Sequence, residues 1–358
     1  MQGPVYNFSA GPAVLPDSVL SQAQQALVDW QGSGLSILSV SHRSDAFMEV
    51  VEESKKDLAD LLGLSDDYHI LFLQGGATAQ FSMVPLNLYG AQKQSLYVDS
   101  GYWSQKAIAE AKRYGAVYVL PVDQLSALNA GKLELPAMDY LHCTPNETID
   151  GVCLPEYPYI SGVPLVGDFS SVLLSEPLKT EDFGVIYAGA QKNLGPAGVT
   201  VVIVRKDLAQ SALPGTPATY VYQNHADKGS LYNTPPTFAW YVVGLVLQWL
   251  KQQGGLAAMA QHNMAKAQYL YACIDNSALY HNTVDVAWRS KMNVVFRLPT
   301  LELEHVFLGK AAEAGLLNLG GHRSMGGIRA SLYNAMPLSG VQALVAFMQE
   351  FERQYGHG

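Results

Sequence analysis

Short apolar runs alternate with amphipathic stretches through most of the chain. Each run is four to six residues long and apolar almost throughout, as in a strand that is buried on both faces. The runs cover residues 69–73, 95–98, 116–120, 139–143, 164–168, 184–188 and 199–204. Strands of this kind, separated by helical patterns, predict an α/β fold in which helices cover both faces of a mainly parallel sheet.

The pattern changes near residue 235, where long helical stretches replace the short strands. Two helices are predicted at 238–250 and 256–274, and after them strands at 293–298 and 326–332 and helices at 302–314 and 340–355. We therefore expect a large domain with an N-terminal arm over residues 1–255. A smaller α+β domain should follow over residues 256–358.

The N-terminal region has two parts. Glycine and proline punctuate residues 7–16, which predicts an irregular arm. Asp17 follows as a predicted N-cap, and Leu20, Ala23, Leu27 and Trp30 recur behind it at helical spacing. We expect these four side chains to face the protein core.

Composition and charge narrow the range of functions. The 358 residues are 49% hydrophobic and 15% charged, as in a globular protein with a large core. A formal net charge of −9 argues against a nucleic-acid partner. It also means that an anionic ligand needs a local cluster drawn from the chain's eight arginines.

Several features indicate the compartment. The most apolar window, residues 238–250, has thirteen residues, whereas a membrane helix needs about 20. The chain does not open on a basic segment followed by an apolar run, and its three scattered cysteines form no metal-ligand pattern. These features predict a cytoplasmic enzyme that has no membrane partner and binds no metal.

One lysine, Lys192, lies between two apolar runs and among small residues. The segment 187–198 reads Tyr-Ala-Gly-Ala-Gln-Lys-Asn-Leu-Gly-Pro-Ala-Gly. Small neighbours allow a bulky group to approach the backbone closely. A solvated lysine in a surface turn is compatible with this segment, and so is a lysine that forms a Schiff base with a carbonyl cofactor.

Asp168 ends the predicted strand that precedes the strand leading to Lys192. A carboxylate at the end of a buried strand needs a partner, such as a helix N-terminus or a salt bridge. In pyridoxal phosphate enzymes the partner is the protonated ring nitrogen, and the pair keeps the ring an electron acceptor. The two residues are 24 positions apart, one strand–connection–strand unit, so both can face one pocket at the strand ends.

Other strand ends carry candidate cofactor contacts. The segment 75–78, Gly-Gly-Ala-Thr, joins a strand to a helix, and such a turn presents backbone N–H groups to a phosphate, although ordinary tight turns read the same way. Trp103 follows the next strand, where it could stack on a planar ring or pack in the core. Thr148 lies in the loop after Cys143 and could meet a ring substituent or simply form a turn.

Short segments along nearly the whole chain match one known family in order. They are residues 7–13, 41–43, 101–103, 145–151, 168–171, 187–193, 232–238, 321–323 and 327–335. The chain resembles the phosphoserine aminotransferase family of class V, fold-type I enzymes, which use pyridoxal phosphate. The resemblance implies transamination between glutamate and 3-phosphohydroxypyruvate, giving O-phosphoserine and 2-oxoglutarate. The family also acts on 4-phosphohydroxythreonine in vitamin B6 synthesis.

The resemblance also implies roles for individual residues. Lys192 corresponds to the Schiff-base lysine, Asp168 to the partner of the ring nitrogen, and Trp103 to the residue that stacks on the ring. Thr148 corresponds to a contact of the ring hydroxyl region. The residues that correspond to phosphate contacts are Ala77, Thr78 and Gln191.

A second subunit and an anionic substrate are implied in the same way. Asn233 and Thr234 correspond to residues that reach the neighbouring subunit's cofactor phosphate, so the resemblance implies a homodimer. Arg329 corresponds to the residue that binds the substrate α-carboxylate. The pocket for the other anionic end corresponds to His42, Arg43, His322 and Arg323. Forked guanidinium groups suit carboxylate and phosphate, which agrees with two arginines in the short stretch 322–329.

One residue departs from the family pattern, because some relatives carry an arginine where Thr78 stands. Either the substrate phosphate relies on Arg43, His322 and Arg323, or its affinity differs.

Other functions remain open on the residues alone. Another transamination on the same fold would share Asp168 and Lys192. A cysteine desulfurase needs a mobile cysteine, but Cys143 and Cys153 precede Asp168 and Cys273 falls in a predicted helix. A dinucleotide enzyme is disfavoured because no Gly-x-Gly-x-x-Gly follows the strand at 69–73. A non-catalytic carrier of pyridoxal phosphate would not need the basic pocket.

Overall fold

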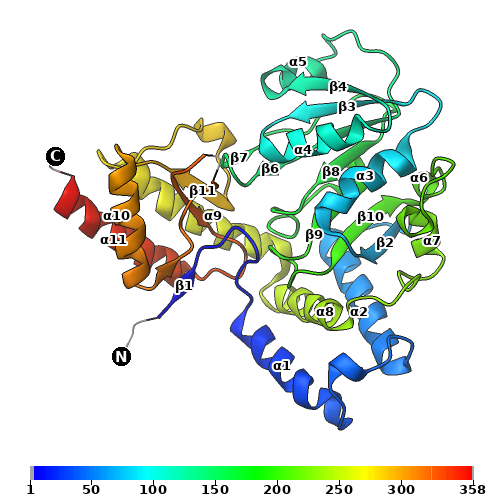
Figure 1. The fold of residues 1–358 in the computed structure, drawn as a ribbon, viewed down its shortest axis with the longest axis horizontal. Helices are drawn as coiled ribbons and strands as arrows, with labels where there is room; N and C mark the ends of the chain where they lie inside the picture. The colour runs from blue at the N-terminus through cyan, green and yellow to red at the C-terminus, as the bar shows by residue number, and fades with distance from the viewer. Residues whose placement is uncertain (1–3, 324, 357–358) are drawn as a thin grey trace.

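The computed structural model describes residues 4–323 and 325–356. It consists of a unit built around a large sheet and a second, smaller unit (Figure 1). Helix α9 (Gly255–Asp275) connects them, because its first half packs in the core of the sheet unit and its second half in the core of the smaller one. Among the described residues, each helix is either too short or too polar to cross a membrane.

The large sheet has seven strands in the order β2-β10-β9-β8-β5-β3-β4. The strands are β2 (Tyr68–Leu73), β3 (Gln94–Asp99), β4 (Ala116–Pro121), β5 (Tyr140–Cys143), β8 (Leu165–Asp168), β9 (Val185–Gly189) and β10 (Thr200–Arg205). Only β10 runs antiparallel to its two neighbours, β9 and β2. The predicted mainly parallel sheet is therefore confirmed.

Helices cover both faces of this sheet, as the continuous apolar runs predict. Along β9, Val185 and Tyr187 belong to one core cluster, whereas Ile186 and Ala188 belong to the cluster on the opposite face. The first cluster includes α3 (Gly76–Leu88) and α4 (Tyr102–Ala111). The second includes α1 (Asp17–Val28), α2 (Asp45–Leu62) and α8 (Thr237–Gln252). Shorter elements are α5 (Leu125–Asn129), α6 (Lys206–Ala209), α7 (Tyr222–Ala226), β6 (Asn146–Glu147) and β7 (Val152–Cys153).

The smaller unit contains the two strands and two helices that the sequence predicts. β11 (Asn293–Phe296) pairs antiparallel with β13 (Ile328–Ser331), and α10 (Leu301–Glu313) and α11 (Leu338–Tyr355) pack with them. The arm is not irregular throughout, because β1 (Tyr6–Asn7) pairs with β12 (Leu316–Leu317). Phe8 accordingly lies in the core of the smaller unit. The domain boundary after residue 255 stays a prediction.

The inward face of α1 differs from the predicted one. Val19, Ala23 and Ala26 are buried, whereas Leu20 and Leu27 are 48% and 40% exposed. The prediction was right for Ala23 and for Trp30, which is buried just beyond the helix. It was wrong for both leucines, because two stripes of similar spacing run along this helix and only one faces the sheet unit. Leu20 and Leu27, together with Val28, Leu35 and Leu38, are exposed apolar side chains of this part of the chain, and the five are here called the α1 patch.

Candidate active site

The carboxyl ends of the parallel strands border a cavity of about 490 Å³, a size common for small-molecule sites. The cavity collects most of the candidates. Those that line it are Ala77, Thr78, Trp103, Thr148, Asp168, Gln191, Lys192, His322 and Arg329. Arg329 lies on β13, so the smaller unit contributes one wall of the cavity.

Lys192 follows β9 and projects into the cavity rather than forming a solvated surface turn. The N-terminal arm lies against it: Ala13 N donates to Gln191 O at 2.8 Å, and Gly11 also lines the cavity. Burial lowers the pKa of Lys192 to about 8, although the Asp168 carboxylate opposes this shift. The free amine is therefore well populated at slightly alkaline pH.

Asp168 ends β8 and is 5% exposed. Its Oδ1 accepts two hydrogen bonds from Ser170, one from the backbone N at 3.0 Å and one from Oγ at 2.6 Å. Within the described residues, no protein donor bonds Oδ2, which leaves this oxygen for a ligand. Burial raises the pKa of Asp168, so a cationic partner would stabilise its charged form.

The turn before α3 has the backbone that its glycines predict. Gly75 and Gly76 have φ values of 99° and 67°, and a Cβ on Gly75 would lie 2.5 Å from the Cβ of Ala79. Ala77 and Thr78 occupy the first helical turn, where backbone N–H groups lack partners within the helix. Because this turn lines the cavity, it offers an anion-binding end.

Trp103 lies in the first turn of α4. The Nζ of Lys192 is 5.9 Å from the centroid of the Trp103 ring. Trp103 Nε1 donates to Thr148 Oγ1 at 2.9 Å, and Arg329 Nη1 donates to Thr148 O at 3.2 Å. Trp103 thus borders the cavity instead of packing wholly in the core.

Of the three basic residues that the sequence predicts in the smaller unit, two line the cavity and one does not. Burial lowers the pKa of Arg329, which lines the cavity. His322 lines it as well, with its ring 5.2 Å from that of Tyr102. Arg323 is exposed and does not line this cavity.

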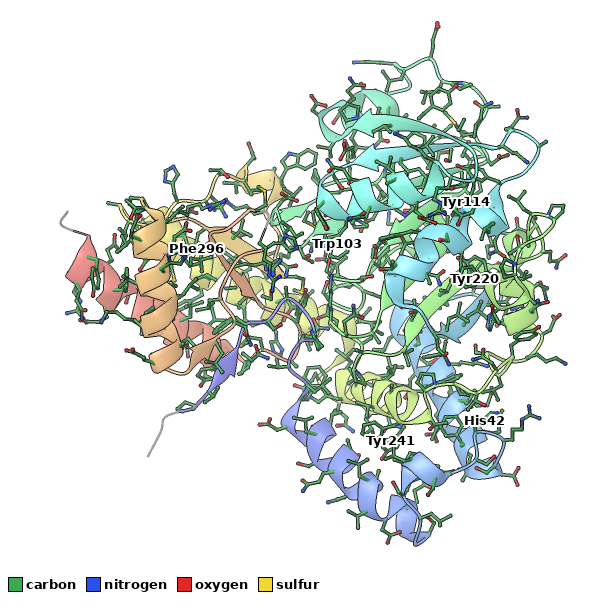
Figure 2. All side chains as sticks on the ribbon, viewed as in Figure 1. His42, Trp103, Tyr114, Tyr220, Tyr241 and Phe296 are labelled. Carbon is green, nitrogen blue, oxygen red and sulfur yellow. The ribbon has the colours of Figure 1, made fainter. Side chains whose placement is uncertain are left out.

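Four expected residues lie away from the cavity of their own chain. Figure 2 shows His42 well separated from Trp103, and Arg43 Nε donates to His42 Nε2 at 3.3 Å. Asn233 and Thr234 are exposed in the loop before α8. One chain therefore does not assemble the complete set that the sequence predicts.

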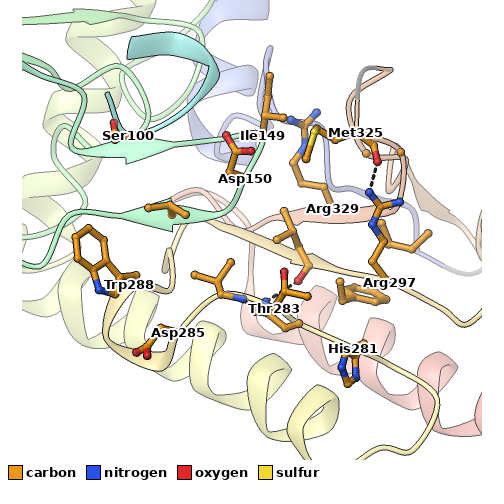
Figure 3. Close-up of a pocket in the computed structure, with 18 of the residues that line it drawn as sticks. Ser100, Ile149, Asp150, His281, Thr283, Asp285, Trp288, Arg297, Met325 and Arg329 are labelled. Atoms are coloured by element: carbon orange, nitrogen blue, oxygen red, sulfur yellow. Dashed lines mark hydrogen bonds between the residues drawn. The ribbon is translucent and has the colours of Figure 1, made fainter. Parts of the chain in front are cut away.

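A second cavity of about 440 Å³ adjoins the first and shares Ile149 and Arg329 with it. Figure 3 shows Arg297 in this cavity, donating to the backbone oxygen of Met325. Lys192 and Asp168 do not line it, so we assign the candidate chemistry to the first cavity.

Among the residues that sequence reasoning missed are Ser170 and Gly11, which line the cavity, and Glu147, which lies behind it. The role of Ser170 could have been predicted from the sequence. It follows Asp168 by two positions, and an aspartate side chain often accepts a hydrogen bond from the backbone N–H two residues later. Gly11 of the arm approaches Lys192 only through tertiary packing. Glu147 is fully buried and bonds the start of α4, a contact with no signal in the local sequence.

Comparisons with known proteins identify the family of this chain. The family described as Aminotransferase class-V matches residues 5–344. The phosphoserine aminotransferase of Nitrosomonas europaea is 51% identical over 364 aligned residues, covering 98% of this chain and 99% of that protein. The solved phosphoserine aminotransferase of Bacillus circulans subsp. alkalophilus has a TM-score of 0.94 at 44% identity, covering 98% of this chain and 99% of that one. The pyridoxal phosphate-bound enzyme from Trichomonas vaginalis has a TM-score of 0.91 at 38% identity, covering 97% and 100%.

The chain therefore belongs to the class-V aminotransferases, which are fold-type I enzymes. Within that class it belongs to the phosphoserine aminotransferase family. Its cofactor is pyridoxal phosphate. The cavity fits this molecule, with an amine for the aldehyde, a carboxylate oxygen without a protein donor for the ring nitrogen, an indole, and a helix N-terminus for the phosphate.

Proposed function

We propose that this chain transfers an amino group between glutamate and 3-phosphohydroxypyruvate, giving 2-oxoglutarate and O-phospho-L-serine. The observation that carries the proposal is the presence of Lys192, Asp168 and Arg329 in one cavity. An amine with a near-neutral pKa, a buried carboxylate and a guanidinium are the groups that this transfer uses. Relatives with about 50% identity carry the same activity in their names.

The chain's own residues have distinct tasks in this proposal. Bound pyridoxal phosphate supplies an aldehyde carbon and an electron-accepting ring. Lys192 Nζ carries a proton to and from the substrate's reacting carbon, because a pKa of about 8 allows it to accept and release protons near neutral pH. Asp168 Oδ2 holds a proton on the ring nitrogen, and Ser170 orients the carboxylate through Oδ1.

We assign the remaining contacts of the cofactor to residues that surround Lys192. Trp103 offers its ring face, and Thr148 accepts the indole N–H while its hydroxyl faces the same cavity. The start of α3 receives the phosphate through its backbone N–H groups. The residues assigned to that phosphate are Ala77, Thr78 and Gln191.

Substrate recognition rests on local positive charge in a chain with a net charge of −9. We assign the substrate α-carboxylate to Arg329 and the distal anion to His322 and Arg323, with Thr78 in place of the arginine of some relatives. Arg323→Ala should then reduce kcat/KM for O-phospho-L-serine at least tenfold, and reduce it much less for an unphosphorylated amino acid. Equal losses for both substrates would contradict the pocket. Arg353→Ala, at an exposed arginine paired with Glu350, is the matched control.

We propose that the site is completed by a second copy of the chain. Support comes from His42, Arg43, Asn233 and Thr234, which lie outside the cavity of their own chain. The α1 patch adds exposed apolar surface, as expected of an interface between copies. In the proposed homodimer, His42 and Arg43 reach the partner's substrate, and Asn233 and Thr234 reach the partner's cofactor phosphate.

Mixing two inactive variants tests this arrangement. In a hybrid of Lys192→Met and Arg43→Ala chains, one site combines the Lys192 of the second chain with the Arg43 of the first. Shared sites therefore predict that activity returns on refolding the two variants together, to about one intact site per hybrid. If Arg43 serves its own chain, neither site is intact and the mixture stays as inactive as its parents.

We also propose a cytoplasmic location, a second substrate and a division into domains. Cys143, Cys153 and Cys273 are free thiols, which suits a reducing compartment. The same anion pocket suits 4-phosphohydroxy-L-threonine of pyridoxine biosynthesis, which a direct turnover assay tests. We place the domain division between residues 255 and 256, near the start of α9, and limited proteolysis at that point tests it.

A further inference from the structure

We propose that Glu147 is a positioning residue of the cofactor pocket, because its carboxylate fixes the start of α4 and with it the ring of Trp103. This inference rests on the proposed role of Trp103 beside the cofactor. Glu147 itself does not line the cavity. It acts through the residues that do.

The carboxylate caps a helix from outside that helix. Glu147 is 0% exposed, its Oε2 accepts from Trp103 N at 2.9 Å, and its Oε1 accepts from Ser104 N at 2.8 Å. These are the second and third residues of α4, whose N–H groups have no partners within the helix. The negative charge also faces the positive end of the helix dipole. The contact adds to a local start signal, because Ser104 Oγ accepts from the backbone N of the N-cap residue Gly101 at 3.0 Å.

Space for this carboxylate exists because residue 101 is glycine. A Cβ on Gly101 would lie 2.8 Å from the Cγ and 2.9 Å from the Cδ of Glu147. It would also lie 2.6 Å from Oδ2 of Asp150. Gly101 has a φ of 154°, which side chains rarely adopt. The start of α4 and the loop that contains Glu147 therefore pack closely together at Gly101.

The loop that contains Glu147 also contacts Trp103 and Arg329, which line the cavity on α4 and β13. Thr148 directly follows Glu147, and its Oγ1 accepts from Trp103 Nε1 while its backbone O accepts from Arg329 Nη1. Trp103 is thus held at its backbone by Glu147 and at its ring by Thr148. Rotation of either residue would move the indole face relative to Lys192, whose Nζ is 5.9 Å from the ring centroid.

The groups around Glu147 shift the pKa of its carboxyl group in opposite directions. Burial raises its pKa to about 7, and the Asp150 carboxylate adds to that shift, whereas the N–H groups of Ser104 and Trp103 lower it. The Lys192 amine is close enough for the Glu147 charge to raise its pKa. Both helix bonds need acceptor oxygens, which only the ionised carboxylate supplies in full.

A double-mutant cycle on cofactor binding tests the proposal. Glu147→Gln keeps the shape but turns an N–H group of the side chain toward a backbone N–H, so at most one helix bond survives. We expect the dissociation constant for pyridoxal phosphate, titrated into cofactor-free protein by tryptophan fluorescence quenching, to rise about tenfold. The binding should be repeated in a Trp103→Phe background, where the effect of Glu147→Gln should fall to about twofold or less.

The outcomes separate this inference from the proposed role of Trp103. If Trp103→Phe weakens binding but Glu147→Gln does not, or if the two effects add in full, Glu147 does not act through Trp103. If Trp103→Phe leaves binding unchanged, the proposed role of Trp103 fails and the inference fails with it. Glu156→Gln, at an exposed carboxylate that bonds Ser126 and Asn129, is the matched control and should bind normally. Should Glu147→Gln not fold, Glu147→Asp, whose carboxylate is one methylene shorter and so lies farther from both N–H groups, serves in the same cycle.

Discussion

Replacing Lys192 with methionine should make the cofactor-free protein more stable at neutral pH. The native structure holds this amine in a cavity that lowers its pKa from 10.5 to about 8. A shift of that size corresponds to about 3 kcal/mol of unfavourable free energy in the charged form, at about 1.4 kcal/mol per pKa unit. Because the cavity admits water, we expect about 1–3 kcal/mol. Methionine is similar in length and carries no charge, so the variant removes this penalty.

The pH dependence identifies the cause. Below pH 8 the lysine is protonated in both the folded and the unfolded protein, so the penalty is present in full. Between about pH 8 and 10.5 only the unfolded chain holds the proton, and wild-type stability rises toward that of the variant. The advantage of Lys192→Met should therefore be largest at pH 7 and should shrink markedly by pH 9.5.

Urea unfolding of cofactor-free protein at pH 7 and 9.5, at one protein concentration, measures this difference. Lys56→Met, at an exposed lysine on α2, controls for the loss of a surface charge and should change stability by less than about 0.5 kcal/mol. If Lys192→Met is less stable than wild type at pH 7, or if its advantage in stability is the same at both pH values, burial of the charged amine does not destabilise the folded protein.

Three further outcomes follow from the site. Gly101→Ala should lower the free energy of unfolding by about 2–4 kcal/mol in urea titrations, because the new Cβ would overlap Glu147 and Asp150 at a strained φ; a loss below 1 kcal/mol would show that the loop yields easily. The raised pKa of Glu147, about 7, favours the protonated form in the folded protein, so wild type should lose up to about 3 kcal/mol relative to Glu147→Gln as pH rises from 4.5 to 7; a constant difference between pH 5 and 7.5 would contradict that pKa. Thr148→Val removes the acceptor for Trp103 Nε1 and should weaken pyridoxal phosphate binding about three- to tenfold in fluorescence titrations, whereas Thr148→Ser should bind nearly normally.

The sheet and the strand-end chemistry were predictable because they depend on local patterns. Continuous apolar runs predict strands covered on both faces, and β9 shows this in the alternation of Val185 and Ile186 between two cores. Asp168 and Lys192 meet because the carboxyl ends of neighbouring parallel strands lie at one edge. The spacing of Asp168 and Lys192 in the sequence therefore predicts that both lie in one pocket.

The features that were missed depend on distant partners. Packing against the sheet unit decides which side of α1 is buried. The local sequence therefore could not show that Val19, and not Leu20, faces the core. The first turn of α4 depends on a carboxylate from Glu147, 43 residues beyond Ser104. His42 and Asn233 lie outside the cavity of their own chain, so their proposed roles depend on a second copy of the chain.

The central claim is that this chain moves an amino group between glutamate and a phosphorylated oxo acid by means of Lys192. The most direct measurement follows the visible absorption of the pyridoxal phosphate-loaded protein while substrates are added in turn. We expect that glutamate bleaches the band and releases 2-oxoglutarate, and that 3-phosphohydroxypyruvate then restores the band and yields O-phospho-L-serine. A band that glutamate leaves unchanged, or the same cycle at full rate in Lys192→Met, would contradict it.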